Sequence, residues 1–91
     1  MTVADVQKII EEKLPGSQAM VKDLTGTQDH YQVTVISSSF EGKKMIDQHR
    51  MVKAIFDPDI QSGVVHALSI KTFTPAEWAK NSAKNSESKG N

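Results

Sequence analysis

The chain has 91 residues, which is enough for one hydrophobic core and leaves no room for a second. Hydrophobic residues make up 37% and charged residues 24%, and this ordinary balance excludes collagen-like, coiled-coil and wholly disordered chains. Eleven basic and eleven acidic residues cancel, so bulk charge does not favour the coating of nucleic acid or of an anionic membrane.

The residue types exclude several further classes of protein. The absence of cysteine excludes a disulfide-stapled scaffold, a zinc ribbon, a thiol nucleophile and a self-sufficient iron–sulfur protein. No apolar run approaches the roughly 18 residues of a membrane span, and the first residues lack the pattern of a secretory signal. We therefore expect a soluble, cytoplasmic protein that does not associate with membranes.

The N-terminal segment predicts an amphipathic helix over residues 3–14. Apolar residues recur there at three- and four-residue spacings, which places them on one face. Thr2 and Asp5 are related to a capping box at the start of the helix, and Pro15-Gly16 is a stop signal.

A hairpin of two strands is predicted next. Residues 18–24 form a mixed strand, and residues 31–37 alternate more clearly, with Tyr31, Val33 and Val35 on one side. The polar loop 25–29, which contains a glycine, would join them.

A second helix is expected over residues 43–56. Its apolar stripe is formed by Met45, His49, Val52 and Phe56, and Asp57-Pro58 should end it because the residue before proline resists the helical conformation.

A third strand and a last helix complete the ordered part of the chain. Residues 64–73 are the most β-prone run, and Thr74, Pro75 and Glu77 have the types preferred at a helix start, with Trp78 as an apolar anchor. Residues 81–91 contain a single apolar side chain and are expected to be a disordered tail.

The order helix, strand, strand, helix, strand, helix indicates an α+β fold of two layers. We expect one domain over residues 1–80, with a three-stranded sheet and helices on one face. The helix between the second and third strands would act as a crossover.

The three histidines are the residues with the most chemical information, because the sequence contains none of the usual catalytic signatures. His66 would share a face of the third strand with Leu68 and Ile70. It is either a histidine hydrogen-bonded at the edge of the core or a metal ligand on a rigid strand. His30 closes the hairpin loop as a solvated residue or a second ligand, and His49 is better explained by packing.

Four basic residues gather around the second helix, namely Lys43, Lys44, Arg50 and Lys53. A solvated helix face is the simpler interpretation. The alternative is a small surface that contacts phosphate groups or docks a partner.

The combination of short motifs resembles the BolA family from the first helix to Trp78. The motifs are Asp29-His30-Tyr31-Gln32-Val33, Phe40-Glu41-Gly42-Lys43, His49-Arg50, Val65-His66-Ala67-Leu68-Ser69-Ile70 and Thr72-Phe73-Thr74-Pro75-Ala76-Glu77-Trp78. The resemblance implies an αββαβα fold with a mixed sheet, related to type II KH domains.

The resemblance also implies a function in iron–sulfur cluster biogenesis and iron homeostasis. BolA-like proteins pair with monothiol glutaredoxins and share a [2Fe-2S] cluster with the glutaredoxin cysteine and glutathione. The family histidine of the third strand corresponds to His66, and His30 matches the loop position that is a histidine in some members. Histidine ligation should make cluster binding sensitive to acid, because each ligating imidazole must be neutral.

We expect the chain to have no catalysis of its own and to be a monomer or weak homodimer when alone. Two other functions remain open. Some BolA-like proteins are described as transcriptional regulators, yet the Gly-x-x-Gly loop of KH domains is interrupted here, where Gly42 is followed by Lys43, Lys44 and Met45. The other alternative is an adaptor that docks a glutaredoxin through the third strand and last helix without a cluster.

Overall fold

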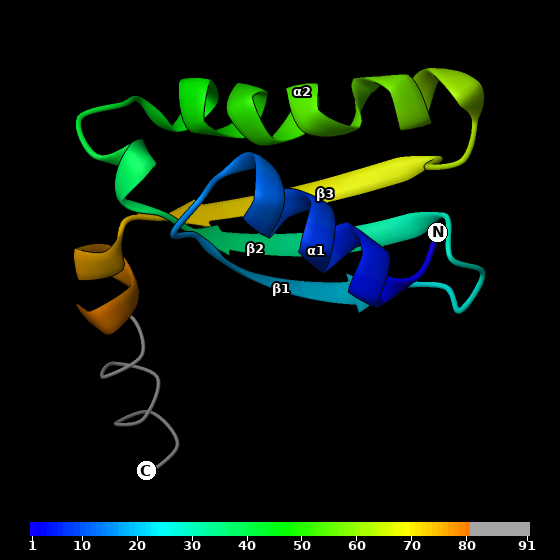
Figure 1. Ribbon diagram of the computed structural model, residues 1–91, viewed down its shortest axis with the longest axis horizontal. Coiled ribbons are helices and arrows are strands. Elements are labelled where there is room, and N and C mark those ends of the chain that lie inside the picture. The colour runs from blue at the N-terminus through cyan, green and yellow to red at the C-terminus, as the bar shows by residue number, and fades with distance from the viewer. Residues whose placement is uncertain (81–91) are drawn as a thin grey trace, which may run out of the picture.

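The computed structural model describes residues 1–80, which follow the predicted order of elements (Figure 1). The helices and strands are α1 (Val3–Lys13), β1 (Gln18–Asp23), β2 (His30–Ile36), the 3₁₀ turn η1 (Ser38–Phe40), α2 (Met45–Ser62) and β3 (Ala67–Phe73). A last helix begins over residues 75–80. The tail expected over 81–91 lies outside the described residues.

The three strands form one mixed sheet in the order β1-β2-β3. β1 and β2 are the predicted antiparallel hairpin, in which Val21 is opposite Val33. β3 runs parallel to β2, with Ile70 opposite Val33, and α2 lies in the connection between these two strands. This arrangement confirms the α+β fold class and the αββαβα order.

The hydrophobic core lies between the sheet and the two long helices, α1 and α2, which cover the same face (Figure 1). The central strand β2 supplies Tyr31, Val33 and Val35, all completely buried, as the alternation of its residues predicts. The other buried residues of this cluster are Val6 and Ile10 of α1, Val52 and Phe56 of α2, and Ala19, Phe40 and Val65.

The opposite face of the sheet carries the alternate residues of each strand, among them Gln32 and Thr34 of β2. The start of the last helix lies toward this side. The ring centroids of Trp78 and Phe73 are 5.3 Å apart, and Trp78 lines a pocket together with Met20, Gln32 and Thr34. Trp78 is thus an apolar anchor, as expected, but it packs away from the core beneath α1 and α2.

The predicted end of α2 at Asp57-Pro58 is wrong, because the helix continues through Pro58 to Ser62 and begins at Met45. Inside a helix, proline removes one N–H donor, its ring crowds the carbonyl four residues earlier, and it disfavours the helical conformation of the preceding residue. Packing of Ile55, Phe56 and Ile60 against the core outweighs that cost. The helix ends at Gly63, which adopts a left-handed conformation with φ of 85°.

The predicted apolar stripe of α2 is also partly wrong. Met45 is 64% exposed, whereas the buried line runs through Gln48, Val52 and Phe56 at four-residue spacings. A buried polar residue therefore occupies the core-facing position of the first turns, and His49 is half-buried beside this line.

The third strand begins at Ala67, three residues later than predicted. Gly63 turns the chain, and the Val65 N–H donates to the Asp59 carbonyl over 3.1 Å, so strand pairing starts only where Ala67 lies opposite His30. The expected alternation fails over this segment, because Val65 is buried while His66 is exposed. His66 consequently lies just before the strand.

Candidate functional site

The candidate site forms where the end of the β1–β2 loop meets the segment that leads into β3. The backbone carbonyl of Asp29 accepts hydrogen bonds from the N–H groups of His66, over 2.7 Å, and Ala67, over 3.2 Å. The parallel register then places His30 opposite Ala67. Backbone pairing alone therefore brings together His30 and His66, which are far apart in the sequence.

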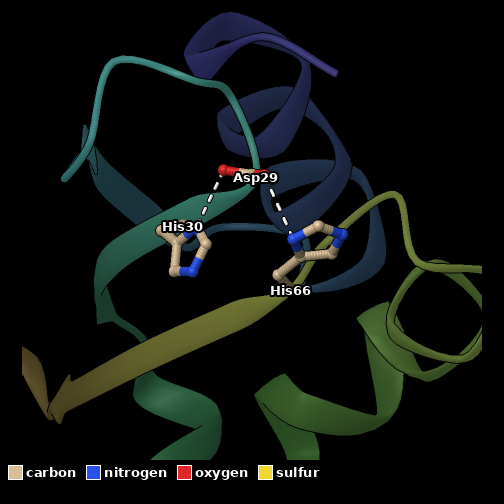
Figure 2. A group of neighbouring side chains, drawn as sticks. All are labelled: Asp29, His30 and His66. Carbon is tan, nitrogen blue, oxygen red and sulfur yellow. Dashed lines mark hydrogen bonds and ion pairs between the residues drawn. The ribbon is translucent and has the colours of Figure 1, made fainter.

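The two imidazole rings lie beside one another, as Figure 2 shows. Their centroids are 5.7 Å apart and their planes meet at 88°, an edge-to-face arrangement. The side chains of His30 and His66 are 38% and 56% exposed, so both rings can be reached by a metal or by a partner protein.

The carboxylate of Asp29 joins the two rings. Its Oδ1 atom lies 2.7 Å from Nδ1 of His30, and its Oδ2 atom lies 3.1 Å from Nδ1 of His66 (Figure 2). The Thr27 hydroxyl donates to the same carboxylate. This hydrogen bond, and next that of His30, hold the pKa of Asp29 below its ordinary value, so Asp29 is an ionised acceptor at neutral pH.

These three residues form a group that can hold a metal ion, since their ligand atoms all lie within 4.8 Å of one another. Imidazole and carboxylate are suitable ligands for several transition metals. The sequence pointed to His30 and His66 as candidates but assigned no role to Asp29. The sequence signal that could have identified Asp29 is its position directly before the candidate ligand His30.

The four basic candidates do not belong to this site. Lys43 and Lys44 precede α2, and Arg50 and Lys53 lie on its exposed side. α2 has 18 residues and is therefore about 27 Å long, with Gly63 and the approach to His66 at its far end (Figure 1).

The two helical members of this basic set have acidic neighbours on α2. Arg50 is 3.9 Å from Asp47 and Lys53 is 3.8 Å from Asp57. Both pairs are exposed, so they contribute little to stability, but they offset much of the positive charge on that side of the helix.

Comparisons with known proteins identify the family. The family model for BolA-like proteins matches residues 7–77. The chain is 31% identical to a BolA homologue from Coxiella burnetii of known structure, with a TM-score of 0.74 over 87% of this chain and 97% of the other. The chain belongs to the BolA family.

Two curated relatives that match part of this chain also carry the BolA name. A BolA-like protein of Dictyostelium discoideum is 45% identical over 56 residues, which are 62% of this chain and 49% of the relative. The DNA-binding transcriptional regulator BolA of Escherichia coli is 34% identical over 53 residues, or 58% of this chain and 50% of the relative. The chain thus spans about half the length of these relatives.

Membership of the BolA family agrees with the fold and with the motifs around the histidine pair. The matched region contains both histidines, Asp29 and all three strands. Among residues 1–80, no helix is both long enough and apolar enough to cross a membrane.

Proposed function

We propose that this BolA family member is a non-enzymatic adaptor that pairs with a monothiol glutaredoxin to bind a [2Fe-2S] cluster. It would act in cluster assembly and trafficking or in iron sensing. The observation that carries the proposal is the exposed pair of His30 and His66 in a family member without cysteine. The resemblance of its motifs to those of glutaredoxin-binding BolA proteins supports the choice of partner.

The donor atoms of the pair suit one iron of a [2Fe-2S] cluster. In Rieske centres two histidines replace two cysteines on one of the two irons, and the reduction potential rises as a result. This chain offers two imidazoles side by side and contains no thiolate. The remaining ligands must therefore come from elsewhere, namely the glutaredoxin cysteine and glutathione.

The proposal requires no reacting group from this chain. His30 and His66 would hold the cluster, which supplies the capacity to carry iron and an electron. The contribution of the protein is to bind and orient, through a hairpin loop and a strand start that the Asp29 carbonyl holds together.

The test is anaerobic reconstitution with a monothiol glutaredoxin, glutathione, iron and sulfide, followed by visible absorption and circular dichroism. The mixed complex should give a spectrum that differs from that of the glutaredoxin homodimer. His66→Ala and His30→Ala should each change that spectrum, because each removes one nitrogen ligand from the same iron.

His49→Ala is the matched control, since His49 is the third histidine of the chain and lies on α2, outside the pair. It should reproduce the wild-type spectrum. Far-UV circular dichroism of every variant checks that the fold is retained. A wild-type spectrum identical to that of the glutaredoxin alone would refute the cluster proposal.

Nucleic-acid binding is the second candidate, because the Escherichia coli relative is named as a DNA-binding regulator. On this chain it would use Lys43 and Lys44, which are exposed ahead of α2. Fluorescence anisotropy with mixed-sequence DNA tests it, because binding through phosphates weakens steeply with salt. Lys43→Ala with Lys44→Ala should then weaken binding more than the control pair Lys8→Ala with Lys13→Ala on α1.

A further inference from the structure

Asp29 contacts both histidines with its two carboxylate oxygens, one oxygen for each ring. Oδ1 meets Nδ1 of His30 at 2.7 Å and Oδ2 meets Nδ1 of His66 at 3.1 Å. The two contacts are made by the same atom of each ring. The Nε2 atoms of both rings are thereby left outside the contacts with Asp29, as Figure 2 shows.

Asp29 is itself held firmly at the junction of the loop and β3. Its backbone carbonyl accepts the N–H groups of His66 and Ala67, and its side chain accepts a hydrogen bond from the Thr27 hydroxyl. Its side chain is 23% exposed, less than either histidine. The carboxylate is therefore the most shielded and most constrained member of the group.

The chemistry of these contacts determines where the ring hydrogens lie. An ionised carboxylate only accepts hydrogen bonds, and a neutral imidazole carries one N–H. A neutral ring whose Nδ1 atom is hydrogen-bonded to the Asp29 carboxylate must carry its hydrogen on Nδ1. The lone pair is then on Nε2. Metal-binding histidines are commonly oriented by a carboxylate in this manner.

We propose that Asp29 is a positioning residue that holds His30 and His66 in the Nδ1–H form and so leaves the Nε2 atom of each ring as its metal-binding atom. This inference deepens the cluster proposal and rests on it for the identity of the metal group. The orientation of the rings is a property of the metal-free chain. It is therefore open to measurement without a glutaredoxin or a cluster.

The first experiment is nitrogen-15 NMR of the histidine rings in the metal-free protein at pH 8. In the wild type, His30 and His66 should both show the hydrogen on Nδ1. Asp29→Ala should remove that preference from both rings. The ring of His49, away from the group, should keep the same signals in every variant and serves as an internal reference.

Asp29→Asn gives a sharper result than removal of the side chain. The amide oxygen accepts one Nδ1–H, but the amide nitrogen only donates, so it pairs with a ring whose Nδ1 carries a lone pair. One ring should therefore keep its hydrogen on Nδ1 while the other moves it to Nε2. Unchanged signals from both rings in Asp29→Asn and Asp29→Ala would overturn the proposal.

Thr27→Val separates the positioning role from a general effect on the loop. It removes the hydroxyl that supports Asp29 but keeps the carboxylate. Both rings should still carry the hydrogen on Nδ1. A loss of that preference as complete as in Asp29→Ala would show that loop structure, and not the carboxylate, sets the ring orientation.

The second experiment measures the cluster shared with a monothiol glutaredoxin. Asp29→Asn should shorten the lifetime of the mixed cluster about tenfold or more, the usual scale for loss of an orienting carboxylate. Glu12→Gln, which removes one exposed carboxylate of α1, should leave the lifetime unchanged. A wild-type lifetime in Asp29→Asn would refute the role of Asp29 while leaving the cluster proposal intact.

Direct ligation by Asp29 is the competing role, and cobalt tests it. If Asp29 were a ligand, Co²⁺ added to the chain alone would give visible absorption bands that Asp29→Asn abolishes. A positioning residue predicts that any such bands persist in Asp29→Asn and disappear in His66→Ala. Bands lost in Asp29→Asn with unchanged ring signals would therefore replace the positioning role with ligation.

Discussion

Tyr31 is a buried side chain whose hydroxyl connects two distant parts of the chain. The hydroxyl donates to the Met1 and Gln28 carbonyls, and the residue is completely buried. Burial, and after it the negative charges of Asp23, Asp29 and Asp5, raises the pKa of Tyr31 above its ordinary value of about 10. The folded state thus keeps the phenolic hydrogen to higher pH than the unfolded chain.

This shift predicts a loss of stability in alkali. Because the folded pKa is raised, the contribution of Tyr31 is complete below about pH 10 and is lost as the pH rises through the folded pKa. Absorbance at 295 nm should show a higher titration midpoint in buffer than in concentrated urea. The sequence has a single tyrosine, so the signal belongs to Tyr31, and equal midpoints would contradict the prediction.

Gln48 is a buried polar residue that the apolar pattern of α2 did not predict. Its Nε2 atom donates to the Phe40 carbonyl over 3.1 Å and to the Lys43 carbonyl over 2.9 Å, and its Oε1 atom accepts from Thr72 over 2.6 Å. Gln48→Leu removes three hydrogen bonds, so it should lower the free energy of unfolding by about 1–3 kcal/mol.

Urea denaturation of a double-mutant cycle tests this connection. Gln48→Leu combined with Thr72→Val should lower the free energy of unfolding by less than the sum of the single changes. Each single change leaves the other side chain without its hydrogen-bond partner. Thr34→Val, on the opposite face of β2, should change the free energy of unfolding by no more than about 0.5 kcal/mol. Additive costs would mean that Gln48 and Thr72 act independently.

Among the elements, α1 owes its start to the capping box that the sequence predicted. The Thr2 hydroxyl accepts the Asp5 N–H over 3.1 Å, and the Asp5 carboxylate accepts the Thr2 N–H over 2.9 Å. Thr2→Ala should lower the free energy of unfolding by about 1 kcal/mol, as for other N-caps. Denaturation monitored by far-UV circular dichroism measures it, and an unchanged midpoint would show that tertiary packing alone sets the start of α1.

The elements also show where local rules succeed and where they fail. Thr2, Pro15 and Gly16 bound α1 through local backbone chemistry, and the structure confirms the helix. Pro58 is also a local signal, but packing of neighbouring residues against the sheet overrides it. The start of β3 depends on pairing with β2, which neighbouring residues do not encode. The β-branched Val64 and Val65 therefore led to a predicted start that is too early.

At the scale of the molecule, the fold could be predicted but the composition of the candidate site only in part. His30 and His66 stood out because histidine is uncommon here and because of their motifs. Their proximity depends on the parallel register that sets Ala67 opposite His30, and this is a property of the whole sheet. The bridge through Asp29 follows from that register and the side-chain geometry, which no spacing in the sequence reveals.

The arrangement of the sheet predicts a gradient of amide hydrogen exchange that includes the site. β2 is paired on both sides and holds three completely buried residues, so its amides should exchange slowest, whereas β1 pairs on one side only within residues 1–80. The amides of His66 and Ala67 should be protected in the metal-free chain, because both donate to the Asp29 carbonyl.

Exchange measured by NMR at neutral pH distinguishes two ways of assembling the site. Protection of His66 and Ala67, together with fast exchange of the exposed loop residue Thr25, means that the backbone pairing beside the two histidines is already formed in the metal-free chain. Binding of the proposed cluster would then require little ordering of the loop, which favours affinity. Unprotected amides at both positions would instead mean that ligand binding itself brings the loop onto β3.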